Sequence, residues 1–420
     1  MHMPVSRSRV IDKTPFFYGW VILTVGTITS VMIGPSQTFT FGLFVDAYVN
    51  ELDLSRSQLS LFYGIATLTA ALLLPLMGRL TDRFGARSMI LWAAAGLGLA
   101  CWTMGQVQGL LVLMIGMVAL RFFGFGSLQL VSNHVIAQWF IRRRGLAMGL
   151  AGQSLAIGLL VFPPLGEALI DQLGWRNAWV AFGILVILIV IPIGWLFFRN
   201  NPEQYGRLPD GEPNLGLQSG ATAAEVNWTL AEAARTPIFW IFALGLGSMA
   251  LAMAGIVFHQ IALYAERGLS REVAIRAFQI IALFSVAGNL GMGRLLDRYS
   301  GRKLLVVALL ILVVALYTLQ IMSTIWQATL CAALLGIVSG SFRVLDATVW
   351  AKYFGRRHLG SIRGATMIGS LGATALGAFP LGLSYDRLGS FNPALTAIML
   401  LPLILAAIAL LIRRPEKVLD

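Results

Sequence analysis

The chain has 420 residues, of which 57% are hydrophobic and only 12% are charged, and its formal net charge is +12. A soluble globular protein needs many more polar residues to cover its surface, so this composition excludes that class and indicates a protein dissolved in lipid. The basic residues are spread over short loops between apolar stretches, whereas a nucleic-acid-binding protein gathers them on one face. The positive charge therefore indicates membrane topology and no nucleic-acid partner.

Apolar stretches follow one another along nearly the whole chain, and crossing about 30 Å of hydrocarbon takes a helix of about 20 apolar residues. We predict twelve transmembrane helices, at 17–45, 57–78, 87–105, 109–139, 146–171, 175–198, 237–265, 271–293, 303–322, 326–353, 361–386 and 392–413. Lys and Arg are concentrated in the alternate loops on the side of both termini, which places the N and C termini in the cytoplasm.

The longest polar stretch, 199–236, divides these helices six and six. It is rich in Pro, Gly, Asn and Glu, so we interpret it as a cytoplasmic linker and not as a catalytic domain. The predicted organisation is an N-terminal six-helix bundle at 1–198, the linker at 199–236, and a C-terminal six-helix bundle at 237–420.

An internal repeat supports two related halves. The segment Gly-Arg-Leu-Thr-Asp-Arg at 78–83 recurs as Gly-Arg-Leu-Leu-Asp-Arg at 293–298, and Asp-Gln-Leu-Gly at 171–174 recurs as Asp-Arg-Leu-Gly at 386–389, both 215 residues later. Repeated membrane halves that enclose a polar cavity near the midplane are the architecture of carriers that expose this cavity to each side in turn.

The loop after the second predicted helix carries the pattern G-x-L-x-D-R-x-G-R-R/K, as Gly78, Leu80, Asp82, Arg83, Gly85 and Arg87, and a degenerate copy ends at Gly301-Arg302-Lys303. On these motifs the chain resembles the major facilitator superfamily over almost its whole length. The resemblance implies an all-α membrane protein with twelve transmembrane helices in two pseudo-symmetric six-helix bundles.

Further segments resemble the bacterial branch of that superfamily related to oxalate:formate antiporters and monocarboxylate transporters. These are Phe17-Tyr18-Gly19-Trp20, Trp139-Phe140 followed by Arg142-Arg143-Arg144, Pro163-Pro164, and Gly174-Trp175-Arg176. The resemblance implies proton-coupled transport of small organic anions across a bacterial inner membrane. Two departures leave the substrate class open. Asn289 occupies the position where that branch usually has a helix-8 arginine, which removes the expected anion anchor, and helix 5 lacks the pattern of drug:proton antiporters, which counts against an exporter.

Arg343 and Asp346 are three residues apart on predicted helix 10 and hence lie on one face of it. A charge inside the bilayer costs about 2.5–3.5 kcal/mol on insertion scales, so it needs a partner or a task. We expect Arg343 to bind the carboxylate of the substrate with its planar fork and Asp346 to accept the coupling proton. The alternative is a permanent ion pair that fixes helix packing.

Arg121 and His259 are two further candidates for proton coupling. Arg121 resembles the helix-4 R-x-x-x-G motif that the superfamily associates with this role, although pairing with a backbone carbonyl is equally compatible with the sequence. His259, towards the outer end of helix 7, can relay protons or contact substrate, since imidazole titrates near neutral pH. The alternative for His259 is a satisfied residue of a helix interface.

Neutral polar side chains on the predicted helices can bind substrate in a cavity: Gln37, Gln129, Gln153, Gln279 and Asn289. In the resembling fold, helices 1, 4, 7 and 10 generally line the cavity, with 5, 8 and 11 contributing. Any one of these residues can instead join two helices. We favour Gln37, because it lies in the middle of predicted helix 1, and Asn289, because it occupies the anchor position of the branch.

The repeated loops are expected to form a cytoplasmic gate, made of Asp82, Arg83, Arg87, Asp297, Arg298 and Arg302. A carboxylate facing a helix N-terminus is stabilised by the helix dipole. The starts of helices 5 and 11 are the expected targets, with Arg142 to Arg144 and Arg363 alongside. The alternative is that these residues only set the orientation of the chain in the membrane. Basic residues are sufficient for that, however, so orientation alone would not require the repeated aspartates.

The predicted function is secondary active transport of a small organic anion, with the proton and the lipid bilayer as the other partners. The alternatives are a carrier or exporter of neutral or cationic molecules, and a solute-sensing receptor, for which the linker is short. An enzyme is not expected, because the sequence has no convincing nucleophile–base pair, metal cluster or phosphate-binding loop, and we expect no cofactor and no metal.

Overall fold

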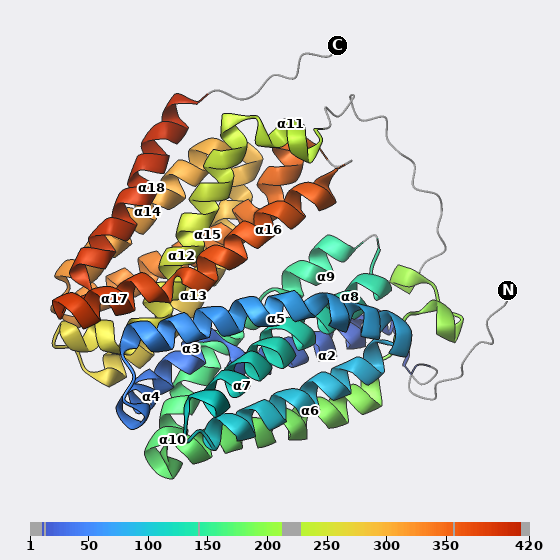
Figure 1. The fold of residues 1–420 in the computed structure, drawn as a ribbon. Coiled ribbons are helices and arrows are strands. Elements are labelled where there is room, and N and C mark those ends of the chain that lie inside the picture. The colour runs from blue at the N-terminus through green and yellow to red at the C-terminus, as the bar shows by residue number, and fades with distance from the viewer. Residues whose placement is uncertain (1–10, 12–13, 142, 212–227, 356–357, 413–420) are drawn as a thin grey trace. The chain divides into compact units, whose positions relative to one another are not determined.

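The computed structural model describes residues 11, 14–141, 143–211, 228–355 and 358–412 (Figure 1). The regular elements within these ranges are helices, and no strand occurs among them. The described residues include ten helices that are long and apolar enough to cross a membrane, judged by length and composition. The predicted number of twelve and the cytoplasmic position of the termini stay predictions.

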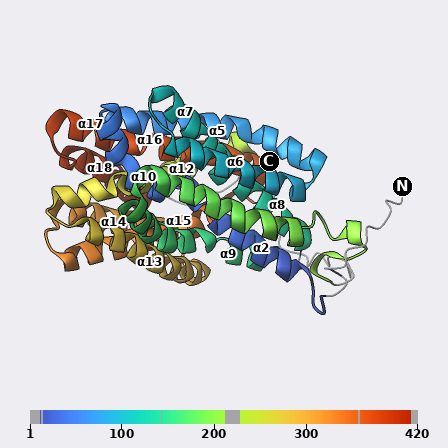
Figure 2. The same ribbon diagram turned by 90° about the horizontal axis from the view of Figure 1, so that it is seen from below.

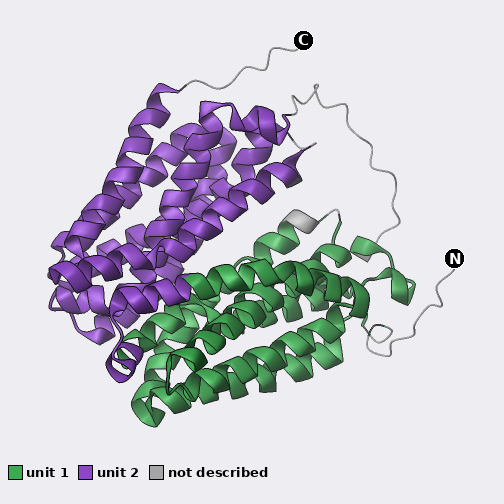
Figure 3. Ribbon diagram, in the orientation of Figure 1, with its two compact units in different colours: residues 1–47, 65–218 green, residues 48–64, 219–420 purple. Residues whose placement is uncertain are grey.

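The helices form two compact units (Figure 3). Unit 1 comprises Met1–Ala47 and Ile65–Gln218, and unit 2 comprises Tyr48–Gly64 and Ser219–Asp420. The division falls inside two helices: α4 (Val45–Leu52), which belongs to unit 2 from Tyr48 on, and α5 (Arg56–Phe84), whose start belongs to unit 2 and whose remainder belongs to unit 1. From the sequence we predicted that the two bundles are separated at the 199–236 linker. That boundary stays a prediction, and it does not account for the sharing of α5 between the units.

Unit 1 begins with a segment that was predicted as one helix at 17–45 but is broken. Its elements are α2 (Gly19–Val31), η1 (Gly34–Ser36), α3 (Thr38–Phe41), η2 (Gly42–Phe44) and α4 (Val45–Leu52). Proline at position 35 has no backbone N–H and glycine at 34 weakens the helix, so the hydrogen-bond ladder stops there. The prediction that Gln37 lies in the middle of a helix is therefore wrong, because Gln37 has an extended backbone.

The other helices of unit 1 match the predicted spans more closely. They are α6 (Ala86–Gly105), α7 (Leu110–Leu120), the π-helix η3 (Arg121–Leu128), α8 (Gln129–Trp139), α9 (Arg144–Ala151) and α10 (Ser154–Phe197). Helix α6 packs along α10, and α2 contacts both α8 and α10 (Figure 2).

Helix α10 covers most of two predicted spans, 146–171 and 175–198, while α9 holds the start of the first. With 44 residues it would be about 66 Å long if straight, more than twice the hydrocarbon thickness. Gly174 inside it has non-helical angles (φ 76°, ψ 159°), which only glycine adopts without strain. The chain therefore turns at Gly174, between the two predicted spans.

Unit 2 contains, besides the start of α5, the second set of membrane helices. They are α12 (Pro237–Glu266), α13 (Arg271–Arg298), α14 (Gly301–Ile321), α15 (Ile325–Phe354), α16 (Leu359–Leu376), α17 (Ala378–Leu388) and α18 (Asn392–Leu411). Helix α13 packs along α15, α14 contacts α15 and α18, and α12 contacts α16, α17 and α18. The glycine that ends α17, Gly389, has a positive φ like its repeat partner Gly174.

The predicted linker is anchored at both of its described ends. On the unit 1 side, η4 (Glu203–Tyr205) and η5 (Pro209–Gly211) follow α10, and the Asp210 carboxylate accepts hydrogen bonds from the backbone N–H of Ile141 (2.9 Å) and Arg143 (3.2 Å). On the unit 2 side, Trp228 N–H donates to Phe354 O, and α11 (Leu230–Ala234) starts with a capping box.

Candidate functional site

The break in the first membrane segment of unit 1 is stabilised by its own side chains. The hydroxyl of Ser36 donates to Ile33 O at 2.7 Å, and the hydroxyl of Thr40 donates to Gly34 O at 2.7 Å. Backbone carbonyls in the hydrocarbon region need internal partners, so these hydroxyls let the chain leave helical geometry within the membrane. Gln37 follows the break and is buried. Discontinuous membrane helices of this kind occur at the binding sites of carriers.

Arg121 fixes this break from the neighbouring π-helix η3. Its Nη1 donates to Ser36 O at 2.9 Å, its guanidinium lies 4.3 Å from the ring centroid of Phe125, and the residue is 3% exposed. Gly124 provides the space, because a Cβ there would lie 2.3 Å from Ser36 Oγ. The carbonyl and the ring face partly compensate the buried charge. Arg121 thus pairs with a backbone carbonyl, which is one of the two possibilities that the sequence left open. Its role in proton coupling stays a prediction.

Gln129 and Asn133 extend the polar surface of unit 1 by one turn of α8. Gln129 Nε2 donates to Asn133 Oδ1 at 3.1 Å and to Ser30 Oγ on α2 at 3.4 Å. Gln129 and Asn133 are half-buried, and Ser30 is fully buried. The amide of Gln129 therefore already joins α2 to α8, while one side of it stays accessible.

In unit 2, α13 and α15 approach each other at backbone distance. A Cβ on Gly336 would lie 2.6 Å from Ile281 O, and one on Gly340 would lie 2.1 Å from Ser285 O and 2.5 Å from Asn289 N. The small-xxx-small pair at 336 and 340 thus packs α15 directly on α13.

This packing places Asn289 on α13 at the level of the α15 turn that leads to Arg343. Arg343 is partly buried and lies eleven residues before the end of α15, about 16 Å along the helix. Gln279 lies ten residues before Asn289 on α13, about 15 Å away along the helix axis. The structure therefore places Asn289 opposite Gly340, three residues before Arg343 and about 4.5 Å from it along α15, and leaves Gln279 apart.

Asp346 forms an ion pair with an arginine of another helix. Its Oδ2 lies 3.2 Å from Arg363 Nη2 on α16, and its Oδ1 accepts from Trp350 Nε1 at 3.3 Å. The side chains of Arg363 and Asp346 are 45% and 30% exposed. Arg363, expected beside the gate, is therefore the cation that holds Asp346, and this acid can be reached by solvent.

His259 on α12 is 1% exposed and lies in a contact between helices of unit 2. Its Nε2 lies 3.1 Å from Ser60 Oγ on α5 and 3.0 Å from Ala378 O on α17. The rings of Phe258 and Phe391 pack against the imidazole. His259 thus lies in a helix interface, which is the alternative stated from the sequence. Substrate binding and proton relay by His259 stay predictions.

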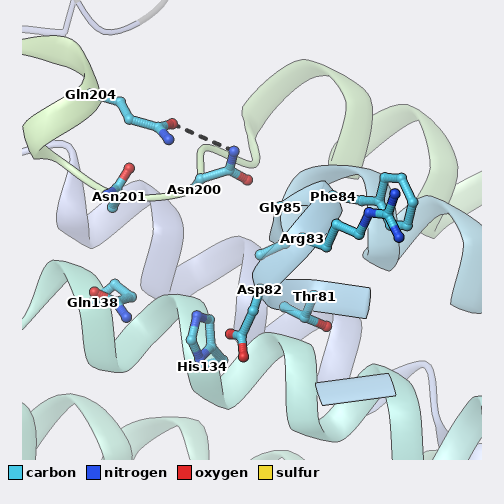
Figure 4. Close-up of a pocket in the computed structure, with 11 residues that line it drawn as sticks. Thr81, Asp82, Arg83, Phe84, Gly85, His134, Gln138, Asn200, Asn201 and Gln204 are labelled. Atoms are coloured by element: carbon cyan, nitrogen blue, oxygen red, sulfur yellow. Dashed lines mark hydrogen bonds between the residues drawn. The ribbon is translucent and has the colours of Figure 1, made fainter. Parts of the chain in front are cut away.

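The first gate loop borders a polar cavity of about 390 Å³ in unit 1 (Figure 4). Asp82 at the end of α5 and His134 on α8 lie next to each other in it, and Asn200, Asn201 and Gln204 of the linker side form the opposite wall. Apart from Asp82, Arg83 and the histidine, the polar groups that line it are neutral hydroxyls and amides.

The cationic residues of that loop have separate contacts within unit 1. The guanidinium of Arg83 lies over the ring of Phe84, and Arg87 donates from its backbone to Asn200 Oδ1 and from its side chain to Trp195 O. Arg87 thereby ties the start of α6 to the end of α10.

In the second loop, Asp297 and Arg298 are exposed, and Arg302 N–H donates to the hydroxyl of Tyr353 on α15. Of the expected gate partners, Arg142 and the side chain of Arg144 lie outside the described residues. The gating role of both loops stays a prediction.

Comparison with known proteins assigns the family. The profile of the Major Facilitator Superfamily matches residues 26–292, which is more than half of the chain. The chain belongs to the Major Facilitator Superfamily. It is a multi-pass membrane protein of a family of small-solute transporters, and the resemblance noted in the repeated loops is confirmed.

Individual relatives of this Major Facilitator protein are distant. The uncharacterized MFS-type transporter YhjX of Escherichia coli (strain K12) is 24% identical over 83% of this chain and 84% of YhjX. The oxalate:formate antiporter of Oxalobacter formigenes is 24% identical over 55% of this chain and 53% of the antiporter. The multidrug resistance protein MdtG of Salmonella choleraesuis (strain SC-B67) is 27% identical over 71% of this chain and 72% of MdtG.

The fold of the Major Facilitator protein also matches a solved structure. The crystal structure of a bacterial homologue of the human lysosomal transporter Spinster superimposes with a TM-score of 0.73 and 17% identity, over 94% of this chain and 96% of that one. At this identity the match concerns the fold alone.

Three contributors to these sites were not predicted from the sequence. Ser36 and Gly124 were not singled out, although the Gly-Pro dipeptide at 34–35 is a strong signal for a broken helix. Arg363 was assigned to the gate and not to Asp346, because no local pattern connects two residues on different helices.

Proposed function

We propose that this Major Facilitator protein is a secondary active transporter of small, monocarboxylate-like organic anions, that it is coupled to protons, and that it works by alternating access in a bacterial inner membrane. The observation that carries the proposal is the group formed by Arg343, Asp346 and Arg363 in unit 2. It contains more positive than negative charge on membrane helices, which is the arrangement an anionic solute requires.

Arg343 is the residue to which we assign the carboxylate. A guanidinium presents parallel N–H donors that match both oxygens of a carboxylate. Asn289 on α13, opposite Gly340 and about one helical turn from Arg343, adds a neutral amide that can hydrogen-bond the remainder of the solute. The similarity to an oxalate:formate antiporter supports an anionic substrate.

Asp346 is the residue to which we assign the proton. While ionised, it accepts hydrogen bonds from Arg363 and Trp350. Protonation removes its charge and leaves Arg363 without a counter-charge, so the preferred arrangement of α15 and α16 changes with the protonation state. A change of this kind couples a proton to a conformational equilibrium.

The remaining candidates have supporting roles in this scheme. Arg121 holds the break that presents Gln37, and Gln129 contributes hydrogen bonds from α8. We assign closure of the cytoplasmic side to Asp82, Asp297 and the arginines of the two repeated loops. Contacts that exist only in the closed state shift the population when they are removed.

The test is transport by the purified protein in proteoliposomes, with a panel of labelled monocarboxylates and dicarboxylates and with or without an imposed pH gradient. We expect a carboxylate to accumulate in the vesicles, and we expect this accumulation to require the pH gradient. Arg343→Gln should abolish uptake, and Asp346→Asn should lose accumulation driven by the pH gradient while it retains exchange of labelled for unlabelled solute. Wild-type affinity and pH dependence in both variants would refute the assignment.

Lys352→Gln is the matched control. Lys352 is a cation on the same helix, but its ammonium group donates to Leu296 O near the end of α15. Its removal is expected to leave affinity for carboxylates unchanged.

The alternative is a carrier or exporter of neutral or cationic molecules. Two observations favour it: Asn289 replaces the branch's helix-8 arginine, and the chain is similar to MdtG over 71% of its length. The same proteoliposomes, loaded with labelled lipophilic cations, separate this alternative from the anion carrier. A receptor would bind solute in this assay and transport none.

A further inference from the structure

Three membrane helices of unit 2 enclose a cavity that the proposed carrier function does not use. The cavity has a volume of about 330 Å³ and lies where α12 packs against α16 and α18 (Figure 1). Helix α12 lines it from Phe239 to Leu251, α16 lines it from Ala365 to Ala373, and α18 contributes Leu401. All of these residues belong to one compact unit, so the cavity is complete within unit 2.

Two glycines keep this cavity open. No atom lies within 4 Å of the position that a Cβ would take on Gly247 of α12 or on Gly369 of α16. The glycines Gly336 and Gly340 of α15 differ from them, because a Cβ on either would lie within 2.6 Å of a backbone oxygen of α13. Gly336 and Gly340 therefore close a helix contact, whereas Gly247 and Gly369 leave space for another molecule.

The lining of the cavity is apolar, and its polar groups already donate within the protein. The hydroxyl of Ser248 donates to Gly245 O at 2.8 Å, and the hydroxyl of Thr366 donates to Arg363 O at 3.2 Å. Apart from the indole N–H of Trp240, the other lining side chains are hydrocarbon. Water in a cavity needs two to four polar partners, so this space favours hydrocarbon over water.

The cavity opens towards the lipid and has the depth of one leaflet. Trp240, Leu244 and Leu401 are half-exposed lining residues, so they lie where it opens. Large apolar side chains that are exposed on membrane-spanning helices face acyl chains. From Phe239 to Leu251 the cavity follows α12 for about 18 Å, close to half of the roughly 30 Å of hydrocarbon in a bilayer.

The end of the cavity next to α11 has the features of a membrane interface. The indole N–H of Trp240 donates to Ala234 O at 2.8 Å, and indole rings concentrate at the level of the lipid head groups. Helix α11 contacts both α12 and α16 at this end. The following residue, Arg235, is exposed, and its positive charge complements the phosphate of a lipid.

We propose that this cavity is a binding site for one acyl chain of an anionic phospholipid, whose head group contacts Arg235. We call it the lipid slot and define it by 239–251 of α12, 365–373 of α16 and Leu401 of α18. The acyl chain enters from the leaflet next to α11 and extends to the level of Leu251. This proposal does not depend on which solute the protein carries.

Photolabelling of the purified protein tests the lipid slot. Proteoliposomes contain a small fraction of phosphatidylglycerol that carries a diazirine in the middle of one acyl chain, and labelled peptides are identified after illumination and digestion. We expect labelling around Gly247 and Gly369 to exceed labelling of α14, whose exposed side chains contact only bulk lipid. Wild-type labelling at the slot that is no stronger than on α14 would overturn the proposal without any variant.

Gly369→Leu and Gly247→Leu fill the slot from two different helices. Each methylene that is displaced lowers binding about fourfold, and a leucine side chain displaces at least two, so labelling at the slot should fall at least about tenfold. Gly364→Leu is the matched control, since Gly364 lies on the nearly opposite face of α16, is exposed, and has no atom within 4 Å of its Cβ position. Gel filtration verifies that each variant is folded. Unchanged labelling in the slot variants, or an equal loss in the control, contradicts a bound chain.

Arg235→Gln tests the head group. A phosphatidylcholine probe with the same labelled chain should react less at the slot than phosphatidylglycerol does. The variant should reduce this preference about fivefold, the effect of one basic residue near an anionic lipid. An unchanged preference would refute the contact with the phosphate. If a lipophilic cation at the concentration of the probe abolishes labelling, the slot is a solute site and the proposal fails.

Discussion

The contact between Gly124 and Ser36 yields a prediction whose size follows from the structure. In Gly124→Ala the new methyl group would lie 2.3 Å from Ser36 Oγ and 2.4 Å from Ser36 Cβ. Overpacking of this kind costs about 1–3 kcal/mol, and the better helix propensity of alanine returns at most about 1 kcal/mol. A net loss of about 1–2 kcal/mol in a unit of about 200 residues should lower the unfolding temperature by roughly 2–8 °C.

The two native cysteines provide the assay. Cys101 and Cys331 are buried without exposed surface, so a thiol-reactive fluorescent dye reports unfolding of the detergent-solubilised protein during a temperature ramp. Gly149→Ala on α9 is the control, because no atom lies within 4 Å of the position of its Cβ. We expect the control to retain or slightly raise the unfolding temperature.

A double mutant tests whether the contact itself is responsible. Ser36→Gly removes the atoms that the new methyl group meets and also loses the hydrogen bond to Ile33 O, worth about 0.5–1.5 kcal/mol. In combination with Gly124→Ala it should recover part of the loss, with a coupling energy of about 0.5–3 kcal/mol. Strictly additive losses would refute the packing of the break on η3.

Three other variants test separate contacts. Gly340→Ala should lower the unfolding temperature in the thiol assay, since its Cβ meets Ser285 O at 2.1 Å, whereas Gly291→Ala, with no neighbour within 4 Å, should not. Arg363→Gln should change stability by less than about 1 kcal/mol, because its ion pair with Asp346 is partly exposed, yet should shift the pH profile of uptake; an unshifted profile contradicts the coupling scheme. Asp210→Asn should speed tryptic cleavage after Arg143 several-fold, because the backbone N–H groups at 141 and 143 lose a charged acceptor; equal digestion rates would show that the linker does not hold this loop.

The helices that the sequence predicted best are those with one uninterrupted apolar run. Helix 4, predicted at 109–139, is observed as a candidate span at Leu110–Trp139, and helix 10, predicted at 326–353, is observed at Ile325–Phe354. Length and polarity at both ends define such spans, because the hydrocarbon thickness is fixed. The superfamily could also be recognised from the repeated Gly-Arg-Leu-x-Asp-Arg loops, because each of these motifs lies within a few consecutive residues.

The features that the sequence did not predict depend on contacts between helices. The mid-helix position of Gln37 was wrong, because apolar flanks concealed a Gly-Pro break whose carbonyls are satisfied by Ser36 and Thr40. The partner of Asp346 was sought three residues away on its own helix, whereas Arg363 reaches it from α16. Both outcomes are decided by which side chains tertiary packing brings within hydrogen-bond distance.

Arg121 of unit 1 and Arg363 of unit 2 are held in physically different ways, and we propose different tasks for them. Arg121 binds a backbone carbonyl and an aromatic face, neither of which gains or loses a proton. Arg363 binds the carboxylate of Asp346, whose side chain is 30% exposed. A reversible coupling step needs a partner that changes charge, because a ligand shifts an equilibrium only through differential interaction with its states. We propose the Asp346–Arg363 pair for this step and a structural task for Arg121, so we expect Arg121→Lys to impair folding of the break and solute affinity while the proton stoichiometry of residual transport stays that of the wild type.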